Sequence, residues 1–353
     1  MSAITQLLRP EILALEPYQH AAWEPQFERL HANENPWRDD DDDTAAGLNR
    51  YPEPEPCAVE ARLAALYGVD PRQVLAGRGS DEGIDLLARA VLAPGRDAAL
   101  ICPPTFGMYA LAARIQGAAL IEAPLDREAG FALDETLLLA RASDAVKLVF
   151  LCSPNNPTGN AIPPAVVERL AGRLEGRAIV VVDEAYVEFA GQPSLAARIG
   201  AHPNLVVLRT LSKAYALAGA RCGSVLGDPA LIDTLKRIRP PYSVPTPTAE
   251  AVLRALEPAA LARASARIAQ LVAERARLAA GLSALPAIRR VWPSAANFLL
   301  VECRDAASVL ARARAAGFLL RDLSRSAHTP GAVRISVGSP GQNDRLLEGL
   351  ESP

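Results

Sequence analysis

Short apolar runs recur along the middle of the chain, and segments with helical periodicity separate them. The runs are rich in branched residues and nearly continuous rather than alternating; they cover residues 97–102, 146–152, 178–183 and 204–209. Continuous apolar strands are typical of a parallel sheet whose two faces are both covered. Residues 164–176, between two of these runs, have apolar positions at helical spacing. The pattern therefore predicts an α/β fold, with a mostly parallel sheet and helices on both sides.

The last third of the chain has a different pattern. Four prolines interrupt the segment 239–247, which can continue neither a helix nor a central strand. Long helical patterns rich in Ala, Leu, Arg and Glu follow over 248–283. Further apolar runs then cover residues 298–303, 318–322 and 332–338. This part of the sequence predicts a second, smaller α/β lobe.

The proline-rich segment divides the chain into two predicted domains. We assign residues 45–244 to the large domain and residues 245–353 to the small one. Residues 1–44 are expected to pack on the small domain, which would then contain both chain ends. The acidic run Asp39–Asp43 within this segment has no apolar period. A solvated loop is the favoured interpretation of that run, and a metal site is the alternative.

Composition excludes several classes of protein. The 353 residues carry a formal net charge of −3, which gives no electrostatic support to nucleic-acid binding. The five cysteines are scattered and form no CxxC pair, which argues against a disulfide framework or a metal site and for a reducing compartment. No apolar run reaches transmembrane length, and the first residues do not have the pattern of a signal peptide. We therefore expect a cytoplasmic protein with no membrane or nucleic-acid partner and no metal.

Polar clusters follow four of the predicted strands. They are "PPTFGMY" (103–109), "SPNNPTG" (153–159), "DEAY" (183–186) and "TLSK" (210–213). Ligands of open parallel sheets bind beyond the carboxyl ends of the strands, so these clusters are expected to meet in one site. Taken singly, each cluster is also compatible with an ordinary turn or with core packing. Tyr109, at the end of the first cluster, is assigned to packing.

Two charged residues stand directly behind apolar strands. Asp183 and Lys213 would each lose hydration there unless an opposite charge met them. They could pair with each other, or they could hold a cationic heterocycle between them. Pyridoxal phosphate suits the second arrangement, because it takes a lysine Schiff base and an acidic partner at its ring nitrogen. Ser212 and Arg221 could then bind its phosphate, as could the helix that starts at Ser80, although this serine could also be a simple N-cap.

The ordered motifs resemble the fold-type I pyridoxal-phosphate aminotransferases. The resemblance rests on "NENP", "NRYPEP", "SPNNPTG", "DEAY", "TLSKAYALAGARCG" and "VRISVG". It covers about residues 17–338, and within this family the motifs are most similar to the histidinol-phosphate aminotransferases. The resemblance implies a large domain with a mostly parallel seven-stranded sheet and a smaller α/β domain.

The resemblance also implies roles for the residues around the cofactor ring. Lys213 would bind the cofactor covalently and move a proton during the reaction. Asp183 would keep the ring nitrogen protonated, and Tyr186 and Asn156 would bind the phenolate oxygen of the ring. Phe106 would stack on the ring face, where many relatives have tyrosine.

The phosphate of the cofactor would be held by a second group of residues. The resemblance assigns this role to Ser80 and Asp81, mainly through their backbone N–H groups, and to Ser212 and Arg221. Tyr51, in "NRYPEP", would reach the phosphate bound by the partner subunit. The protein would therefore be a homodimer with shared active sites.

The substrate would bind through arginines of the small lobe. By resemblance, Arg334 would bind the anionic end of the substrate, with Arg321, Tyr18 and Asn156 beside it. The implied reaction is ping-pong transamination of histidinol phosphate with 2-oxoglutarate and glutamate. An aromatic amino-acid aminotransferase and a pyridoxal-phosphate-dependent threonine-phosphate decarboxylase are the alternatives of the same fold. A cofactor-binding regulatory module without turnover is the alternative outside catalysis.

Overall fold

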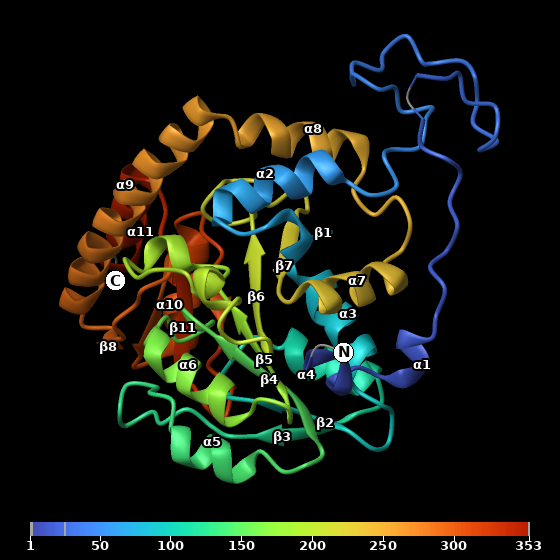
Figure 1. Cartoon of the computed structure of the whole chain (residues 1–353). Helices are drawn as coiled ribbons and strands as arrows, with labels where there is room; N and C mark the ends of the chain where they lie inside the picture. Colours follow the sequence, from blue (N-terminus) through green and yellow to red (C-terminus); the bar gives the residue numbers. More distant parts are fainter. Residues whose placement is uncertain (1–2, 25, 352–353) are drawn as a thin grey trace.

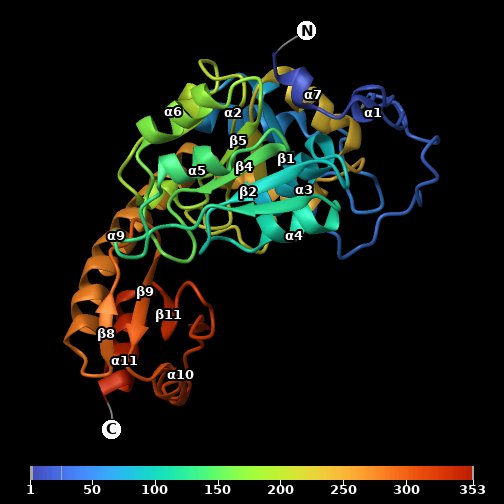
Figure 2. The ribbon, with the colours of Figure 1, turned by 90° about the horizontal axis from the view of Figure 1, so that it is seen from below.

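Two β-sheets organise the molecule. The computed structural model describes residues 3–24 and 26–351 of the chain. Within these residues, seven strands form the larger sheet in the order β1-β7-β6-β5-β4-β2-β3, and four strands form the smaller sheet in the order β10-β11-β9-β8. The long helix α9 (Pro258–Ala284) runs from the large lobe to the small one, and the two lobes are seen side by side in Figure 2.

The larger sheet confirms the predicted fold class. Its strands are β1 (Val74–Gly77), β2 (Ala98–Ile101), β3 (Ala119–Glu122), β4 (Val146–Cys152), β5 (Ile179–Asp183), β6 (Leu205–Thr210) and β7 (Gly223–Leu226). Of the seven strands described, β7 alone runs in the opposite direction, so the sheet is mostly parallel, as expected. The four predicted strands correspond to β2, β4, β5 and β6. The apolar pattern of the sequence did not predict the short strands β1, β3 and β7.

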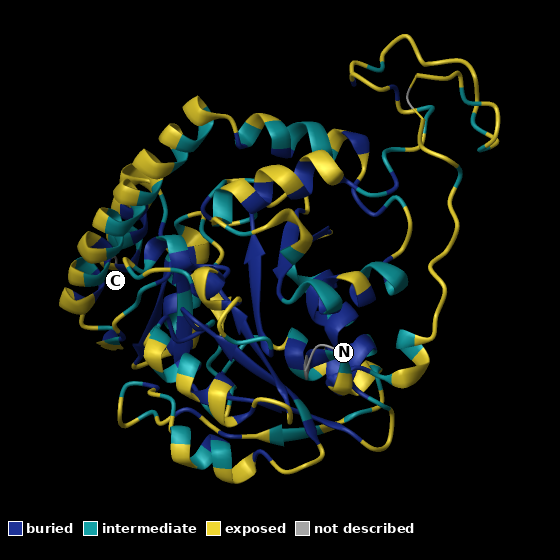
Figure 3. Ribbon diagram, viewed as in Figure 1, coloured by how far each residue is buried: buried dark blue, intermediate teal, exposed yellow. Residues whose placement is uncertain are grey.

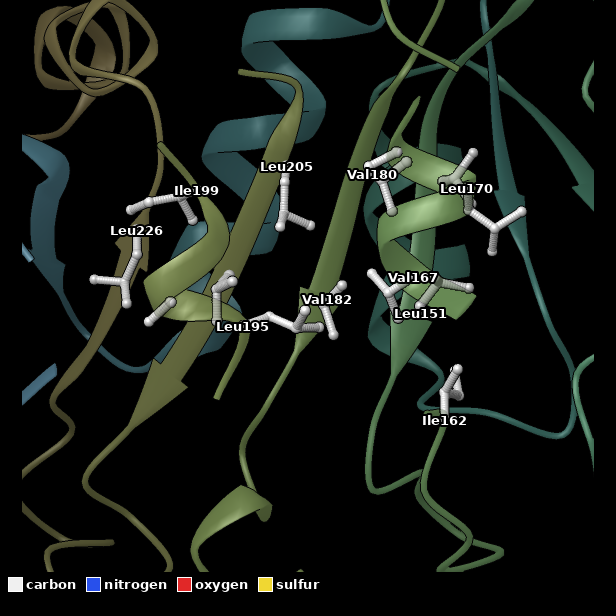
Figure 4. Packing of buried hydrophobic residues seen from close by; sticks show 14 of the residues in the cluster. Leu151, Ile162, Val167, Leu170, Val180, Val182, Leu195, Ile199, Leu205 and Leu226 are labelled. Atoms are coloured by element: carbon white, nitrogen blue, oxygen red, sulfur yellow. The ribbon is translucent and has the colours of Figure 1, made fainter. Parts of the chain in front are cut away.

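Helices cover both faces of this sheet. They are α2 (Cys57–Tyr67), α3 (Ser80–Val91), α4 (Met108–Ile115), α5 (Glu135–Arg141), α6 (Pro164–Arg173), α7 (Pro229–Ile238) and α8 (Thr246–Ala255), with short 3₁₀ turns η2 (Pro71–Gln73), η3 (Val187–Phe189) and η4 (Leu195–Arg198). Val180 and Val182 of β5 join the core on the α6 face, whereas Ile179 and Val181 join the core on the α3 face. Figure 4 shows the first of these cores, where Leu170 packs near Val180. Burial on both faces explains why the strands are apolar without alternation.

The small lobe has its own sheet and core. Its elements are β8 (Ile288–Val291), β9 (Phe298–Cys303), α10 (Ala306–Ala315), β10 (Arg321–Asp322), β11 (Ala332–Ser336) and α11 (Pro340–Glu351). Its strands pair antiparallel throughout. Side chains of α9, β9 and β11, among them Leu282, Val301 and Val333, form its apolar core.

Two of the predicted domain boundaries differ from those in the structure. That assignment placed residues 1–44 on the small lobe, but the first elements, η1 (Ala3–Leu7) and α1 (Pro10–Leu13), lie on α7 of the large lobe. Ile4 and Leu8 are buried there in the core on the α3 face. The small lobe was also expected to begin at residue 245, yet α8 packs against α2. The chain therefore leaves the large lobe at the start of α9.

An extended segment, which we call the N-terminal arm (described residues 14–24 and 26–52), projects from the large lobe. Figure 1 shows the arm reaching away from the sheet, and Figure 3 shows that most of it is exposed. The acidic run lies here as a turn: Asp42 accepts hydrogen bonds from Thr44 and from the backbone of Leu48. The bond from the Thr44 hydroxyl is the main cause that lowers the pKa of Asp42 to about 2. Within the acidic run, Asp42 therefore stabilises this turn through hydrogen bonds inside the arm.

Candidate active site

A cavity of about 540 Å³ opens where the carboxyl ends of β4, β5 and β6 face the small lobe. Its lining contains eleven of the residues that the sequence assigned to the site: Ser80, Asp81, Phe106, Asn156, Asp183, Tyr186, Ser212, Lys213, Arg221, Arg321 and Arg334. The polar clusters that follow separate strands thus meet in one place, as the parallel topology predicts. The volume is within the usual range for a small-molecule site.

One end of the cavity is built to receive an anion. Gly79 precedes α3 with a φ of 89°, and no side chain caps the helix, so the N–H groups of its first turn face the cavity end. A Cβ on Gly223 would lie 2.5 Å from the backbone nitrogen of Ser80, so only glycine allows β7 to approach this turn. Arg221 Nη2 lies 3.3 Å from Asp81 Oδ2 at the same end. Helix dipole and guanidinium together favour a phosphate here.

Asp183 lies at the floor of the cavity as the last residue of β5 and is buried. It accepts hydrogen bonds from Tyr109 Oη at 2.8 Å and from the Ala185 backbone nitrogen at 3.0 Å. Burial raises the pKa of Asp183 to about 6, and the hydrogen bond from Tyr109 opposes this shift. Within the described part of the chain, no ion pair joins Asp183 to Lys213. The alternative of a direct pair is therefore not what the structure adopts.

Lys213 lies three residues beyond the end of β6 and lines the cavity. The turn before it is fixed, because the Ser212 backbone nitrogen donates to Thr210 Oγ1 at 3.1 Å. Burial is the main cause that lowers the pKa of Lys213, and the charge of Arg334 lowers it further. The Nζ atom lies 5.9 Å from the ring centroid of Tyr186. A lysine with a lowered pKa is more often neutral and can act as a nucleophile or a base.

The two asparagines of "SPNNPTG" have different positions. Asn155 is buried and holds two motifs together: it donates to the Pro104 carbonyl at 2.8 Å and accepts from Thr105 Oγ1 at 2.9 Å. Asn156 lines the cavity instead, where its side-chain oxygen accepts from Arg334 Nη1. The sequence assigned Asn156 to the site and Asn155 only to a turn, so this bridging role of Asn155 was missed.

Tyr109 is the functional residue that the sequence reasoning assigned only to packing. Its side chain is fully buried, and its ring stacks on Phe150 at 4.9 Å and meets the edge of Phe106 at 5.7 Å. Its hydroxyl binds Asp183. The available signal was its position, because Tyr109 belongs to the same cluster as Phe106 and is the second residue of α4.

The other end of the cavity carries two arginines of the small lobe. Arg321 and Arg334 lie opposite each other in the pairing of β10 with β11. Arg334 is half-buried above the Phe298 ring, at 5.3 Å from its centroid, and burial lowers its pKa. Two adjacent guanidinium groups form a site for an anionic group of a substrate.

Tyr18 and Tyr51 do not line the cavity of their own chain. Both are on the N-terminal arm, where Tyr18 is 70% and Tyr51 is 50% exposed. The ring of Tyr51 stacks on Tyr242 at 4.6 Å. Their sequence-based roles at the cavity therefore remain proposals.

The residues present fit pyridoxal phosphate. Asp183, a buried carboxylate that forms no ion pair among the described residues, can meet a protonated ring nitrogen. A half-buried amine with a lowered pKa, Lys213, faces the same space. The helix start at Ser80 supplies N–H groups for a phosphate. Carboxylate, amine and anion site are the three groups that this cofactor requires.

The fold and this constellation define a fold-type I pyridoxal-phosphate enzyme. The model of the family "Aminotransferase class I and II" matches residues 30–350, and the chain belongs to this family. It is a pyridoxal-phosphate-dependent aminotransferase.

Individual relatives agree with this assignment. The chain is 50% identical over 360 residues to the histidinol-phosphate aminotransferase of Stenotrophomonas maltophilia (strain R551-3), with 99% of this chain and 97% of that protein covered. The crystal structure of histidinol-phosphate aminotransferase from Sinorhizobium meliloti in complex with pyridoxal-5'-phosphate is similar with a TM-score of 0.76 at 25% identity, covering 86% of this chain and 82% of that one. The fold alone is shared with L-threonine-O-3-phosphate decarboxylase from Porphyromonas gingivalis, with a TM-score of 0.73 at 24% identity, covering 86% and 90%.

Proposed function

We propose that this aminotransferase transfers an amino group between histidinol phosphate and 2-oxoglutarate, in histidine biosynthesis. The observation that carries the proposal is the similarity, over nearly the whole chain, to a protein named histidinol-phosphate aminotransferase. The paired Arg321 and Arg334 support it, because histidinol phosphate offers a phosphate to such a pair and has no α-carboxylate. Glutamate, the partner substrate, would present its carboxylate to the same pair.

Each part of the cavity has a proposed role toward the cofactor. Lys213 would bind it through its amine, and Asp183 would hold the proton of the ring nitrogen. Tyr186 and Asn156 would donate hydrogen bonds to the ring oxygen, and Phe106 would cover the ring face. The phosphate would lie at the start of α3, with the following residues around it: Ser80, Asp81, Ser212 and Arg221.

The side chains of this chain would then carry the reaction as follows. When bound, the cofactor supplies an electron sink and a temporary carrier for the amino group. Lys213 Nζ, whose lowered pKa favours the neutral amine, would move a proton between the substrate carbon and the neighbouring carbon of the bound cofactor. Asp183 would remain ionised opposite the ring nitrogen, since a cation beside it offsets the cost of burial. Arg334 and Asn156 would fix the anionic end and so orient the substrate carbon toward Lys213.

The assembly is part of the same proposal. We infer a homodimer in which Tyr51 and Tyr18 of the arm serve the partner subunit's cavity. Their distance from their own cavity and the exposure of the arm support this arrangement. All five cysteines are free, which supports the further proposal that the protein works in the cytoplasm. Among the described residues, no helix combines the length and apolar character that crossing a membrane requires.

The proposal is tested with the purified protein and pyridoxal phosphate. Histidinol phosphate, phenylalanine and threonine phosphate are each supplied with 2-oxoglutarate, and glutamate and carbon dioxide are measured. Preferred turnover of histidinol phosphate supports the proposal. Preference for phenylalanine, carbon dioxide release from threonine phosphate, or no turnover at all would each replace it with one of the three alternatives. Lys213→Ala is the matched inactive control, because it removes the amine that binds the cofactor.

A further inference from the structure

We propose that Arg209 is a positioning residue that, together with Glu184 and Glu188, fixes the distance between the two strand ends that carry Asp183 and Lys213. These three side chains form what we call the Arg209 network. The inference rests on the proposed function only in that it concerns the same cavity; its readouts need no substrate.

The network lies directly behind the two motifs of the site. Glu184 is the neighbour of Asp183, and Arg209 is in β6, four positions before Lys213. Neither Glu184 nor Arg209 lines the cavity, and both are buried, at 2% and 5% exposed. Successive residues at a strand end point to opposite sides. Asp183 therefore faces the cavity while Glu184 faces the network.

Charged contacts cross from one strand end to the other. Arg209 Nη2 donates to Glu188 Oε1 at 2.5 Å, and Nη1 lies 3.5 Å from Glu184 Oε2. Arg209 Nη1 also donates to Ser194 Oγ at 3.0 Å, and this hydroxyl donates to Glu184 Oε2 at 2.5 Å. The guanidinium lies 4.4 Å from the ring centroid of Tyr67. Arg209 is thus held on several sides by groups from different segments.

The network reaches both sides of Lys213. Before it, the backbone nitrogen of Glu184 donates to the Leu208 carbonyl at 3.0 Å, which extends the pairing of β5 with β6 to the point where the motifs begin. After it, Ala214 and Tyr215 pack in one apolar cluster with Ala185 and Phe189. The segment that carries Lys213 is therefore tied to the segment that carries Asp183 at two places.

Stability alone does not explain this arrangement. Buried ion pairs are often no more stable than apolar residues of similar size, because desolvation offsets the attraction. Arg209 Nε is buried without a hydrogen-bond partner among the described atoms, which adds to that cost. What the charged contacts add is direction, since each fixes the relative position of two backbone segments. The network thereby sets the separation of Asp183 and Lys213, the two residues that are proposed to bind the cofactor.

The test compares two buried arginines. Arg209→Met removes the charge and keeps the length of the side chain. Arg239→Met is the matched control: the Arg239 side chain is 2% exposed and pairs with Glu55 and Glu60, and none of these three lines the cavity. The measurements are the dissociation constant of pyridoxal phosphate from titration of the cofactor-free protein, the circular dichroism of the bound cofactor, and thermal unfolding.

We expect Arg209→Met to weaken cofactor binding about tenfold and to change the circular dichroism of the bound cofactor, because Asp183 and Lys213 would move apart or rotate. Arg209→Lys, which retains the charge but loses the planar fork, should fall between it and the native protein. Arg239→Met should lower the unfolding temperature to a similar extent and leave both cofactor readouts unchanged. The proposal would be overturned if both variants lowered the unfolding temperature equally while Arg209→Met kept the native cofactor affinity and circular dichroism.

A milder variant decides the question if Arg209→Met does not fold. Glu188→Gln removes one charge of the network but keeps a side-chain oxygen that can accept from Arg209. It should still weaken cofactor binding about threefold and alter the circular dichroism, and unchanged values would overturn the proposal. Lack of turnover of histidinol phosphate by the native protein would refute the proposed function, but it would leave these cofactor measurements unaffected.

Discussion

Tyr109 Oη donates a hydrogen bond of 2.8 Å to Asp183 Oδ2, and the two residues are 74 positions apart in the sequence. The tyrosine comes from the first turn of α4 and the aspartate from the end of β5. The bond is buried and supports the ionised form of a carboxylate that burial otherwise drives toward the neutral form. Toward the proposed cofactor site, Tyr109 would therefore act through Asp183, as a positioning residue.

Tyr109→Phe should weaken cofactor binding without unfolding the protein. The substitution keeps the ring that stacks on Phe150 and removes only the donor to Asp183. A hydrogen bond to a charged group contributes about 1.5–3 kcal/mol, so we expect a loss of about tenfold or more in cofactor affinity near pH 7. Titration of the cofactor-free protein measures this, and thermal unfolding serves as the control for folding. Native affinity in the variant would show that the tyrosine only packs.

The contribution of Asp183 to the stability of the cofactor-free protein should decrease as the pH rises from about 4 to 6. The folded-state pKa of Asp183 is raised from 3.8 to about 6, so in this window the folded chain binds more protons than the unfolded chain. The contribution of Asp183 to the free energy of unfolding is therefore largest below pH 4 and decreases by roughly 3 kcal/mol as the pH passes 6. Urea unfolding at several pH values measures the change.

Asp183→Asn isolates this contribution from other titrating groups. The charge of Asp81 raises the pKa of Asp183, and the charge of Lys213 lowers it. The adjacent Glu184 also has a raised pKa, because it is buried. Only the difference between the native protein and the asparagine variant belongs to Asp183. An identical pH dependence in both would mean that folding leaves the pKa of Asp183 unchanged. Cofactor affinity should change in the opposite direction and increase as the pH rises through 6, because the ring nitrogen needs the carboxylate.

The sequence could predict the strands and most of the cavity for one physical reason. Strands buried on both faces are continuous apolar runs, and parallel strands present their carboxyl ends at one edge. Asp183 and Lys213 were therefore recognisable as charges placed behind apolar segments. The resemblance to a known family then supplied roles for Phe106 and Arg334, which no local pattern distinguishes from packing or surface residues.

What the sequence could not predict depends on contacts between distant segments. The bond from Tyr109 to Asp183 exists only because α4 packs on the sheet. Strands such as β1 and β7 have four residues each and carry no periodic signal of their own. The amphipathic first residues, including Ile4, can pack on either lobe, and only the tertiary structure shows that they join the large one.

Gly223→Ala should disrupt the phosphate end of the cavity. The new Cβ would lie 2.5 Å from both the carbonyl carbon of Gly79 and the nitrogen of Ser80, so the start of α3 must move. Overpacking of this kind costs about 1–3 kcal/mol, and here it also displaces the N–H groups for the phosphate. We expect a lower unfolding temperature and cofactor affinity reduced by about tenfold or more. Gly219→Ala, where a Cβ has no neighbour within 4 Å, is the control and should change neither.

Arg334→Ala should separate substrate binding from cofactor binding. Arg334 lies beside Arg321 on the small-lobe side of the cavity, and its guanidinium donates a hydrogen bond to Asn156. Loss of a charged fork should raise the KM for histidinol phosphate about 100-fold, whereas the dissociation constant of pyridoxal phosphate should change less than about threefold. Arg334→Lys should recover only part of the loss, because a lysine cannot form two parallel bonds to a phosphate.

A second arginine of the same lobe provides the control for Arg334. Arg290 stacks over the Trp292 ring at 3.5 Å and does not line the cavity, so Arg290→Ala should leave both KM and cofactor affinity unchanged. If Arg334→Ala instead weakened cofactor and substrate binding equally, its bond to Asn156 would be the part that matters, and Arg334 would be a support for the cofactor rather than a substrate-binding residue. The ratio of the two losses thus decides which side of the cavity Arg334 serves.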